Sequence, residues 1–143
     1  MQITSAKEAD IQGILALQTQ IYRVDALAPN AAETLKNQLQ DKCCDVLIVK
    51  KDSHIVGTAT IYYIKVAARG KPYALLEGLV VDRKQRHLGI GSKLFKECVE
   101  VAKRKNCYKM IFTSGTDRKD AQDFNQKLGL KNGAQNLDLI SKR

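Results

Sequence analysis

The feature that most constrains this chain is a glycine-bearing turn between an apolar strand and an amphipathic helix. A strand is expected over Tyr73–Val81, the turn has the pattern Arg86-x-x-Gly89-x-Gly91, and a helix is expected over Ser92–Lys105. The start of a helix leaves about four backbone N–H groups without partners and carries the positive end of the helix dipole. Glycines there remove the Cβ atoms that would hold a ligand away from these groups. The turn is therefore predicted to bind an anion, and a pyrophosphate fits it best.

Two better-known phosphate-binding motifs do not fit this turn. A dinucleotide-binding fold needs a G-x-G-x-x-G pattern near the start of a βαβ unit, with an acid about 20 residues later. This turn has two glycines, and they follow the fourth or fifth expected strand. A P-loop needs Gly-Lys-Ser/Thr after four intervening residues, and Gly91-Ser92-Lys93 has the wrong order. Both motifs are excluded.

The rest of the chain predicts a mixed α/β (or α+β) fold in one domain over residues 1–143, because the length suits one domain and no linker or repeat interrupts it. Helical periodicity is expected over Glu8–Tyr22, from Asn30 to Gln40 with a capping box of Asn30 and Glu33, and over Asp120–Leu128. Further strands are expected at Ile3–Ser5, Val46–Val49, Ile55–Ile64, Tyr108–Thr113 and Ala134–Ile140.

The composition narrows the possible partners. The formal net charge of +9 favours a phosphate-bearing or polyanionic partner, but no aromatic residues are interleaved with the basic ones, so nucleic acid is not expected. No apolar run approaches the ~20 residues that span a bilayer, and the first residues lack the pattern of a secretory signal, which is therefore not expected. A cytoplasmic protein without membrane contact is expected. The cysteines show no CxxC or zinc spacing, which predicts no metal and four reduced thiols at Cys43, Cys44, Cys98 and Cys107.

Three blocks of the sequence, in order, resemble the GNAT superfamily of N-acetyltransferases. The first runs from Leu76–Val81 through Arg86–Gly91 into the following helix and resembles the acetyl-CoA motif of the family. The second, Asn106–Ile111, resembles the strand after the motif helix, and the third, Ala121–Leu130, resembles the Phe-Tyr-x-Lys-x-Gly-Phe helix. The resemblance covers roughly residues 3–131, which is nearly the whole chain.

This resemblance implies a strongly twisted, mostly antiparallel sheet of six or seven strands that splays open beside the fourth strand, with about four helices. Acetyl-CoA is the implied cosubstrate, and the chain is expected to be a monomer or homodimer. A bulge is expected near Gly78. The resemblance places the cofactor's pantetheine arm along Leu79, Val80 and Val81, and its pyrophosphate against Arg86, His87, Leu88, Gly89, Ile90, Gly91 and Ser92.

The implied reaction is direct transfer of an acetyl group from acetyl-CoA to a primary amine. The expected acceptor is a small molecule or amino-acid derivative, or else a peptide or protein. Glu77 is the candidate general base, because a carboxylate in an apolar strand is costly unless it is functional or paired, and burial makes it a stronger base. The alternative is that Glu77 faces outward and is paired with a nearby Lys or Arg.

The sequence departs from the family at Asn125, where members commonly carry the Tyr that protonates the leaving thiolate. An amide can donate a hydrogen bond to sulfur but cannot supply a proton at neutral pH, so Asn125 orients the cofactor, another group protonates the thiolate, or activity is low. Tyr108 begins a neighbouring strand and is a poor replacement. Of Tyr62 and Tyr63, which alternate on one strand, one is expected to face the acceptor cleft and the other a helix. The departure leaves a second function open, an acetyl-CoA-binding module with little or no catalysis that acts as a sensor or regulator.

Overall fold

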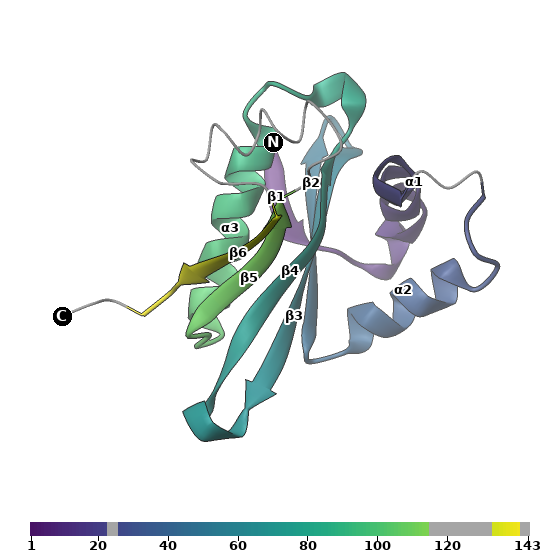
Figure 1. Ribbon diagram of the computed structural model, residues 1–143. Helices are drawn as coiled ribbons and strands as arrows, with labels where there is room; N and C mark the ends of the chain where they lie inside the picture. The colour runs from purple at the N-terminus through teal and green to yellow at the C-terminus, as the bar shows by residue number, and fades with distance from the viewer. Residues whose placement is uncertain (23–25, 115–132, 141–143) are drawn as a thin grey trace.

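The structure is a computed structural model that describes residues 1–22, 26–114 and 133–140. Six strands form one sheet, and their order across the sheet is their order along the chain (Figure 1). Every neighbouring pair is antiparallel except β4 and β5, which are parallel. This sheet confirms the predicted mixed, mostly antiparallel fold. The strands are β1 (Gln2–Ser5), β2 (Cys44–Lys51), β3 (His54–Val66), β4 (Lys71–Val81), β5 (Lys109–Ser114) and β6 (Gly133–Asp138).

Helices cover both faces of the sheet. One face is covered by α1 and α2 and the opposite face by α3, which connects β4 to β5 (Figure 1). Within the described ranges no helix combines the length and the apolar character needed to cross a bilayer. The predicted helix over Asp120–Leu128 lies outside the described residues. The helices are α1 (Ile11–Tyr22), α2 (Ala31–Gln40) and α3 (Ile90–Arg104), and the 3₁₀ turns are η1 (Glu8–Asp10), η2 (Ala67–Arg69) and η3 (Arg83–Gln85).

The apolar spacing in α3 determines how this helix packs. Leu94, Cys98 and Ala102 recur every four residues and are fully buried against the sheet, as the sequence predicts for Cys98. Phe95 meets Phe112 of β5 edge to face, with 5.0 Å between the ring centroids. The helix therefore holds β5 against β4, although the two strands are far apart in sequence.

The core under α1 and α2 is smaller, and its helix start differs from the prediction. α2 begins after Asn30 as predicted, but the capping box is wrong, because the Asn30 side chain makes no capping hydrogen bond. Instead the backbone N–H and the hydroxyl of Thr34 both donate to the Asn30 carbonyl oxygen, each at 2.9 Å. The buried residues of this core are Ile11, Ile14, Leu15, Leu35, Cys44, Val46 and Ile48.

β4 contains a bulge in its middle. Glu77 lies opposite Thr60 of β3 and Val80 lies opposite Thr58, so the two residues between them on β4, Gly78 and Leu79, share a single partner position on β3. Gly78 has a φ of 63°, which glycine adopts without the Cβ penalty of other residues. The predicted bulge near Gly78 is confirmed. One consequence is that Glu77 and Val80 face the same side of the sheet.

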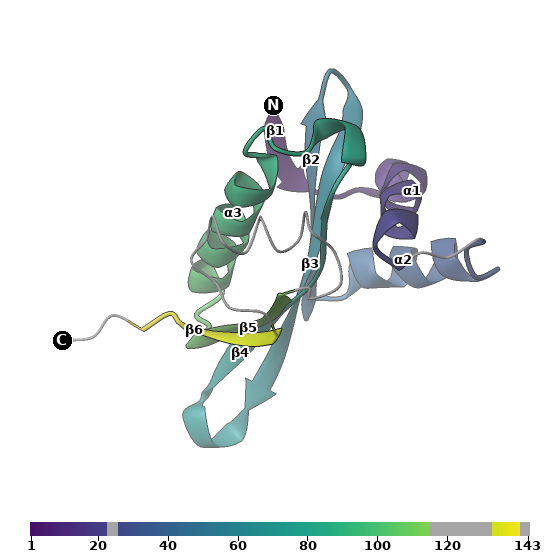
Figure 2. The same cartoon turned by 45° about the horizontal axis from the view of Figure 1, so that its top comes forward.

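β4 and β5 pair over only part of their length. The parallel register begins at Ala74 and ends at Leu76, opposite Phe112. Beyond this point residues 77–81 of β4 pair with β3 alone among the described strands. Figure 2 shows β5 and β6 running at a wide angle to the upper part of β4. This confirms the predicted opening of the sheet beside its fourth strand.

The cysteines differ sharply in exposure. Cys43 is exposed, whereas Cys44, Cys98 and Cys107 are buried, and all are free thiols. Burial raises the pKa of Cys44 to about 11 and that of Cys98 to about 12, so both are protonated at neutral pH.

We expect a chromogenic disulfide reagent at about pH 8 to titrate one thiol rapidly in the native protein, because thiolates react and the three buried thiols are shielded. The same reagent in denaturant should titrate all four thiols. Cys43→Ser should remove the fast reaction. Rapid reaction of three thiols in the folded protein would contradict the described core.

Candidate functional site

The turn after β4 leads directly into the start of α3. Asp82 follows the last residue of β4, and its carboxylate accepts a hydrogen bond from the backbone N–H of Lys84 at 3.3 Å, which caps η3. α3 then begins at Ile90 with Gly89 as its N-cap, two residues earlier than the sequence predicts. The N–H groups of Gly91 and Ser92 therefore belong to the first turn of α3.

This helix start is open to a ligand. The N–H of Lys93 donates to the Gly89 carbonyl at 3.2 Å as the first bond of the helix, so those of Ile90, Gly91 and Ser92 have no acceptor inside it. Gly89 has a φ of 81°, and among the described residues, its own chain neighbours aside, no atom lies within 4 Å of the position a Cβ would occupy. The first turn of α3 contains no acidic residue. The positive end of the dipole is therefore left uncompensated by the helix's own side chains.

Arg86 secures the turn to the strand. Its Nε donates to the carbonyl oxygen of Val81, the last residue of β4, at 3.0 Å. The ammonium group of Lys51, at the end of β2, donates to the side-chain oxygen of Gln85 at 3.3 Å. The sequence predicts that Arg86 contributes a fixed positive charge, and the bond to Val81 fixes it at the base of the turn.

His87 adopts an uncommon backbone conformation, with a φ of 67°, and its side chain is exposed. The left-handed region costs a residue with a Cβ roughly 1–2 kcal/mol, whereas glycine gives back about 0.5–1 kcal/mol through its greater freedom in the unfolded chain.

His87→Gly is therefore expected to raise the free energy of unfolding by about 0.5 kcal/mol, measured as a higher urea midpoint at unchanged slope. His54→Gly is the matched control, because His54 is also exposed but begins β3 and has no positive φ. The control should lower the midpoint. A His87→Gly protein less stable than the wild type would contradict this account of the turn.

Beyond Leu76, where pairing with β5 ends, β4 offers a ligand its backbone more than its side chains. Leu79 and Val81 pack against the core on the α3 face, and Val80 is buried on the opposite face. Their side chains thus pack against other parts of the protein. What this part of the strand offers to a ligand is its peptide groups, along the edge that no described strand pairs with. A ligand arm that contains amides can pair with such an edge as an added strand does. Because Val81 leads into the turn, an anion at the turn and an arm along β4 are positioned as parts of one ligand.

Glu77 is exposed, so the predicted burial of this carboxylate is wrong. The pairing of β4 with β5 ends at Leu76, and the side chain emerges beside the opening on the face that α1 and α2 cover. No hydrogen-bond or ion-pair partner of Glu77 exists in the part of the chain that the structure describes. The alternative was an outward-facing glutamate paired with Lys or Arg. The side chain does face outward, but none of the described residues pairs with it.

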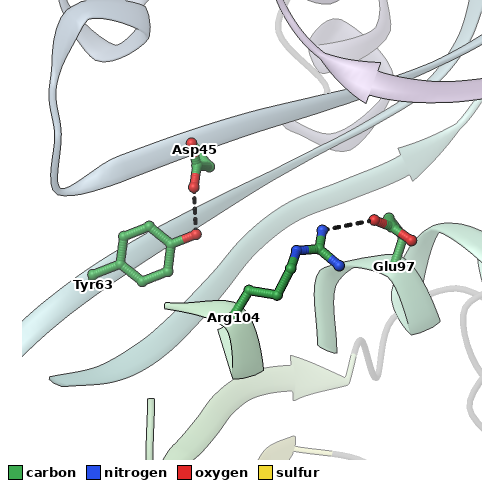
Figure 3. A network of polar contacts seen from close by, with 4 residues as sticks. All are labelled: Asp45, Tyr63, Glu97 and Arg104. Atoms are coloured by element: carbon green, nitrogen blue, oxygen red, sulfur yellow. Dashed lines mark hydrogen bonds and ion pairs between the residues drawn. The ribbon is translucent and has the colours of Figure 1, made fainter. Parts of the chain in front are cut away.

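The structure resolves which tyrosine faces which side. Tyr62 lies on the Glu77 face, and its hydroxyl oxygen accepts a hydrogen bond from the Gln38 side chain of α2 at 2.6 Å. Tyr63 lies on the α3 face and donates to the carboxylate of Asp45 at 2.5 Å (Figure 3). Burial raises the pKa of Tyr63, and the hydrogen bond to Asp45 raises it further. Tyr63 is therefore a poor proton donor and lies on the wrong face to serve Glu77.

A hollow of about 290 Å³ lies between α1 and α2. Its lining is apolar apart from four uncharged polar residues, which are Gln18, Asn30, Thr34 and Gln38. Because Gln38 also binds Tyr62, the hollow borders the sheet face that carries Glu77. Neither the hollow nor the Gln38–Tyr62 bond is predicted from the sequence, because the two residues are 24 positions apart and follow no periodic pattern.

The structure brings most of the predicted site residues together. The segment 77–81, the turn and the first residues of α3 are contiguous at the open edge of β4. Asn125, the residue predicted to replace the usual tyrosine, lies outside the described residues. The contacts that hold the turn at Val81 and Gln85 are not predicted from the sequence, and nothing in the local pattern points to them.

Known proteins resemble this chain in sequence. The chain matches the model of the acetyltransferase (GNAT) family over residues 11–130. It is 32% identical over 78 residues to a protein of Trypanosoma brucei brucei named glucosamine 6-phosphate N-acetyltransferase, an alignment that covers 54% of this chain and 51% of the relative. The chain thus spans about half the length of that relative.

Solved structures share the fold. A putative acetyltransferase from Agrobacterium tumefaciens is 22% identical, with a TM-score of 0.80 and coverage of 100% of this chain and 99% of the other. A predicted acetyltransferase from Clostridium acetobutylicum, solved with acetyl-CoA, is 15% identical, with a TM-score of 0.71 and coverage of 92% and 90%. At these identities the likeness establishes the fold alone.

Proposed function

Because the chain belongs to the acetyltransferase (GNAT) family, we propose that it transfers an acetyl group from acetyl-CoA to the primary amine of a small molecule. Membership in the family confirms the resemblance expected from the sequence. The proposal goes further, because it names the donor, the reaction and the class of acceptor.

The observation that carries the proposal is the continuity between two features: the edge of β4 that no described strand pairs with beyond Leu76, and the start of α3, whose first N–H groups have no acceptor inside the helix. Residues 77–81 offer peptide groups on one side, and the turn that follows offers the N–H groups of Ile90, Gly91 and Ser92 at the positive end of α3. A pyrophosphate joined to an amide-bearing arm matches both parts. Coenzyme A has this construction, and the Clostridium acetobutylicum structure was solved with acetyl-CoA.

Specific residues of the chain would hold such a donor. The start of α3 binds the pyrophosphate through backbone N–H groups, Gly89 keeps the approach free of a Cβ, and Arg86 adds positive charge at the base of the turn. Leu79 and Val81 offer their peptide groups to the arm. When bound, acetyl-CoA supplies an acetyl group activated as a thioester.

Glu77 is the proposed general base. An amine acceptor reaches neutral pH as an ammonium ion, which cannot act as a nucleophile until it loses a proton. The carboxylate of Glu77 emerges at the opening of the sheet and accepts this proton directly or through one water molecule. Its lack of a partner among the described residues leaves both oxygen atoms available for the task.

The hollow between α1 and α2 is the proposed place for the body of the acceptor. Its size suits a small molecule better than a folded protein surface, and its uncharged amide and hydroxyl groups favour a neutral polar ligand. The Trypanosoma relative is named for a phosphorylated amino sugar, so amino sugars with and without phosphate are the first acceptors to compare.

A second function is supported by Asn125, because the resemblance to the family implies a proton-donating tyrosine at this position. In that case the chain binds acetyl-CoA with little or no turnover and acts as a sensor or regulator.

One experiment separates these two functions. Release of free coenzyme A is measured with amino sugars, amino-acid derivatives and short peptides as acceptors, alongside a thermal melt with and without acetyl-CoA. An enzyme gives both a shift in the melt and release with some acceptor, whereas a sensor gives the shift alone. A melt that acetyl-CoA leaves unchanged would exclude both functions.

A further inference from the structure

One side chain joins α1 to the turn after β4. The side-chain nitrogen of Gln20 donates to Asp82 Oδ1 at 3.4 Å, and its side-chain oxygen accepts from the backbone N–H of Arg83 at 3.1 Å. A single amide thus holds two consecutive residues, and these are the first two after β4. The carboxylate of Asp82, which Gln20 contacts, also caps η3. The hydrogen bond therefore holds the residue that fixes the conformation of the turn.

Gln20 stands on the helix that forms one wall of the hollow. Leu15 and Gln18 of α1 line the hollow, and Gln20 follows them on the same helix, two residues after Gln18. Ile14 and Leu15 are buried in the core under α1, so this part of the helix is fixed to the sheet, whereas Gln18 and Gln20 near its end are only half-buried. A change in the order of this end of α1 therefore reaches both the hollow and the turn.

Two other side-chain contacts hold the turn to the sheet. Lys51 contacts Gln85 from the end of β2, and Arg86 contacts Val81 from within the segment. Both of these bonds tie the turn to strands. Gln20 instead ties the turn to α1, a helix on the Glu77 face, so it links the turn to the side of the sheet where the hollow lies.

We propose that Gln20 is a positioning residue that couples the anion-binding turn to α1, so that a ligand at the turn orders the end of α1 and the adjoining wall of the hollow. The inference rests on the proposed function, since the ligand of the turn is taken to be the donor. Because coupling between two sites is reciprocal, an acceptor in the hollow tightens donor binding by the same factor. Gln20 touches no reacting atom.

The test is amide hydrogen exchange of the full chain with and without coenzyme A, which needs no knowledge of the acceptor. In the wild type, coenzyme A should slow exchange in peptides that cover the turn and also in peptides that cover the second half of α1, by about fivefold or more in the latter. In Gln20→Ala the slowing at the turn should persist, and the slowing in α1 should be lost.

Two further variants sharpen the test. Gln12→Ala is the matched control, because it makes the same substitution at an exposed position of α1 about two turns earlier and should retain both effects. Gln20→Glu keeps the side-chain length but replaces the donor with a carboxylate that repels Asp82, and it should lose the α1 effect as Gln20→Ala does.

The outcomes are distinguishable. Slowing at the turn without slowing in α1 of the wild type would overturn the coupling while leaving donor binding intact. Undiminished slowing of α1 in both Gln20 variants would overturn the role of Gln20. If coenzyme A slows exchange nowhere in the wild type, the proposed function fails first, and the coupling fails with it.

Discussion

Gly89→Asp is expected to abolish the stabilisation of the protein by acetyl-CoA. The substitution places a side chain on a residue whose φ is 81°, and it adds a negative charge where three backbone N–H groups meet the positive end of α3. The charge would repel a pyrophosphate, and we expect the affinity to fall by about 100-fold or more. At a ligand concentration about 100 times the wild-type dissociation constant, the wild-type melting temperature should rise by about 8 °C and that of the variant by almost nothing.

The chain offers a closely matched control at Gly70. This residue has a φ of 64°, and beyond its chain neighbours no atom of the described part of the protein lies within 4 Å of its Cβ position, so Gly70→Asp introduces the same kind of strain and the same charge. It lies between β3 and β4, away from the turn, and should retain the full shift with acetyl-CoA. Equal shifts in the two variants would show that the turn does not bind the donor.

Gly91→Glu separates charge from backbone strain. Gly91 lies inside α3 and is not among the glycines with positive φ, so a side chain there is compatible with the helix. This variant should fold at least as well as Gly89→Asp and should also lose the shift. A normal shift in Gly91→Glu would show that backbone strain, and not the added charge, causes the loss of the shift in Gly89→Asp.

Glu77→Gln is expected to lower kcat by about 100-fold or more with any acceptor that the wild type acetylates, since general base catalysis commonly contributes that much. The substitution keeps the size of the side chain and its exposure but removes the atom that accepts a proton. The dissociation constant for acetyl-CoA should remain within about twofold, because the proposed donor site uses other residues. The measurement is kcat against pH together with a separate binding titration.

Glu100→Gln provides the control for loss of a surface carboxylate. Glu100 lies on α3 and forms an exposed ion pair with Lys103 at 3.7 Å, a kind of contact that contributes little to stability. Its removal should leave kcat unchanged. A Glu77→Gln protein that turns over at the wild-type rate across the whole pH range would exclude Glu77 as the base.

Much of the fold could be predicted because local patterns and packing agree. The apolar spacing of α3 specifies both that it is a helix and which side is buried, and Cys98 lies where that spacing places it. The bulge at Gly78 and the turn at Gly89 could be anticipated because each needs a conformation that glycine adopts readily.

The errors have physical causes that the sequence does not contain. The burial of Glu77 was wrong because the apolar run of β4 suggests neighbours on both sides, whereas pairing with β5 stops one residue before it. The capping box at Asn30 was wrong because the Asn30 side chain accepts no hydrogen bond from the first N–H groups of α2, and the hydroxyl of Thr34 donates to the Asn30 carbonyl instead. Alternation put Tyr62 and Tyr63 on opposite faces but could not say which tyrosine lies on which face, because that depends on the side of the sheet against which α2 and α3 pack.

Residues 77–81 of β4, which pair with β3 alone among the described strands, also bear on how the protein avoids aggregation. A strand edge without a neighbour is a template on which another chain can add itself, and in this protein that edge lies inside a sheet rather than at its border. Natural sheets protect such rows with bulges and with charged side chains beside the edge. Gly78 supplies the bulge and the exposed Glu77 the charge, so the residues that shape the proposed reaction site also discourage a foreign strand from adding to this edge.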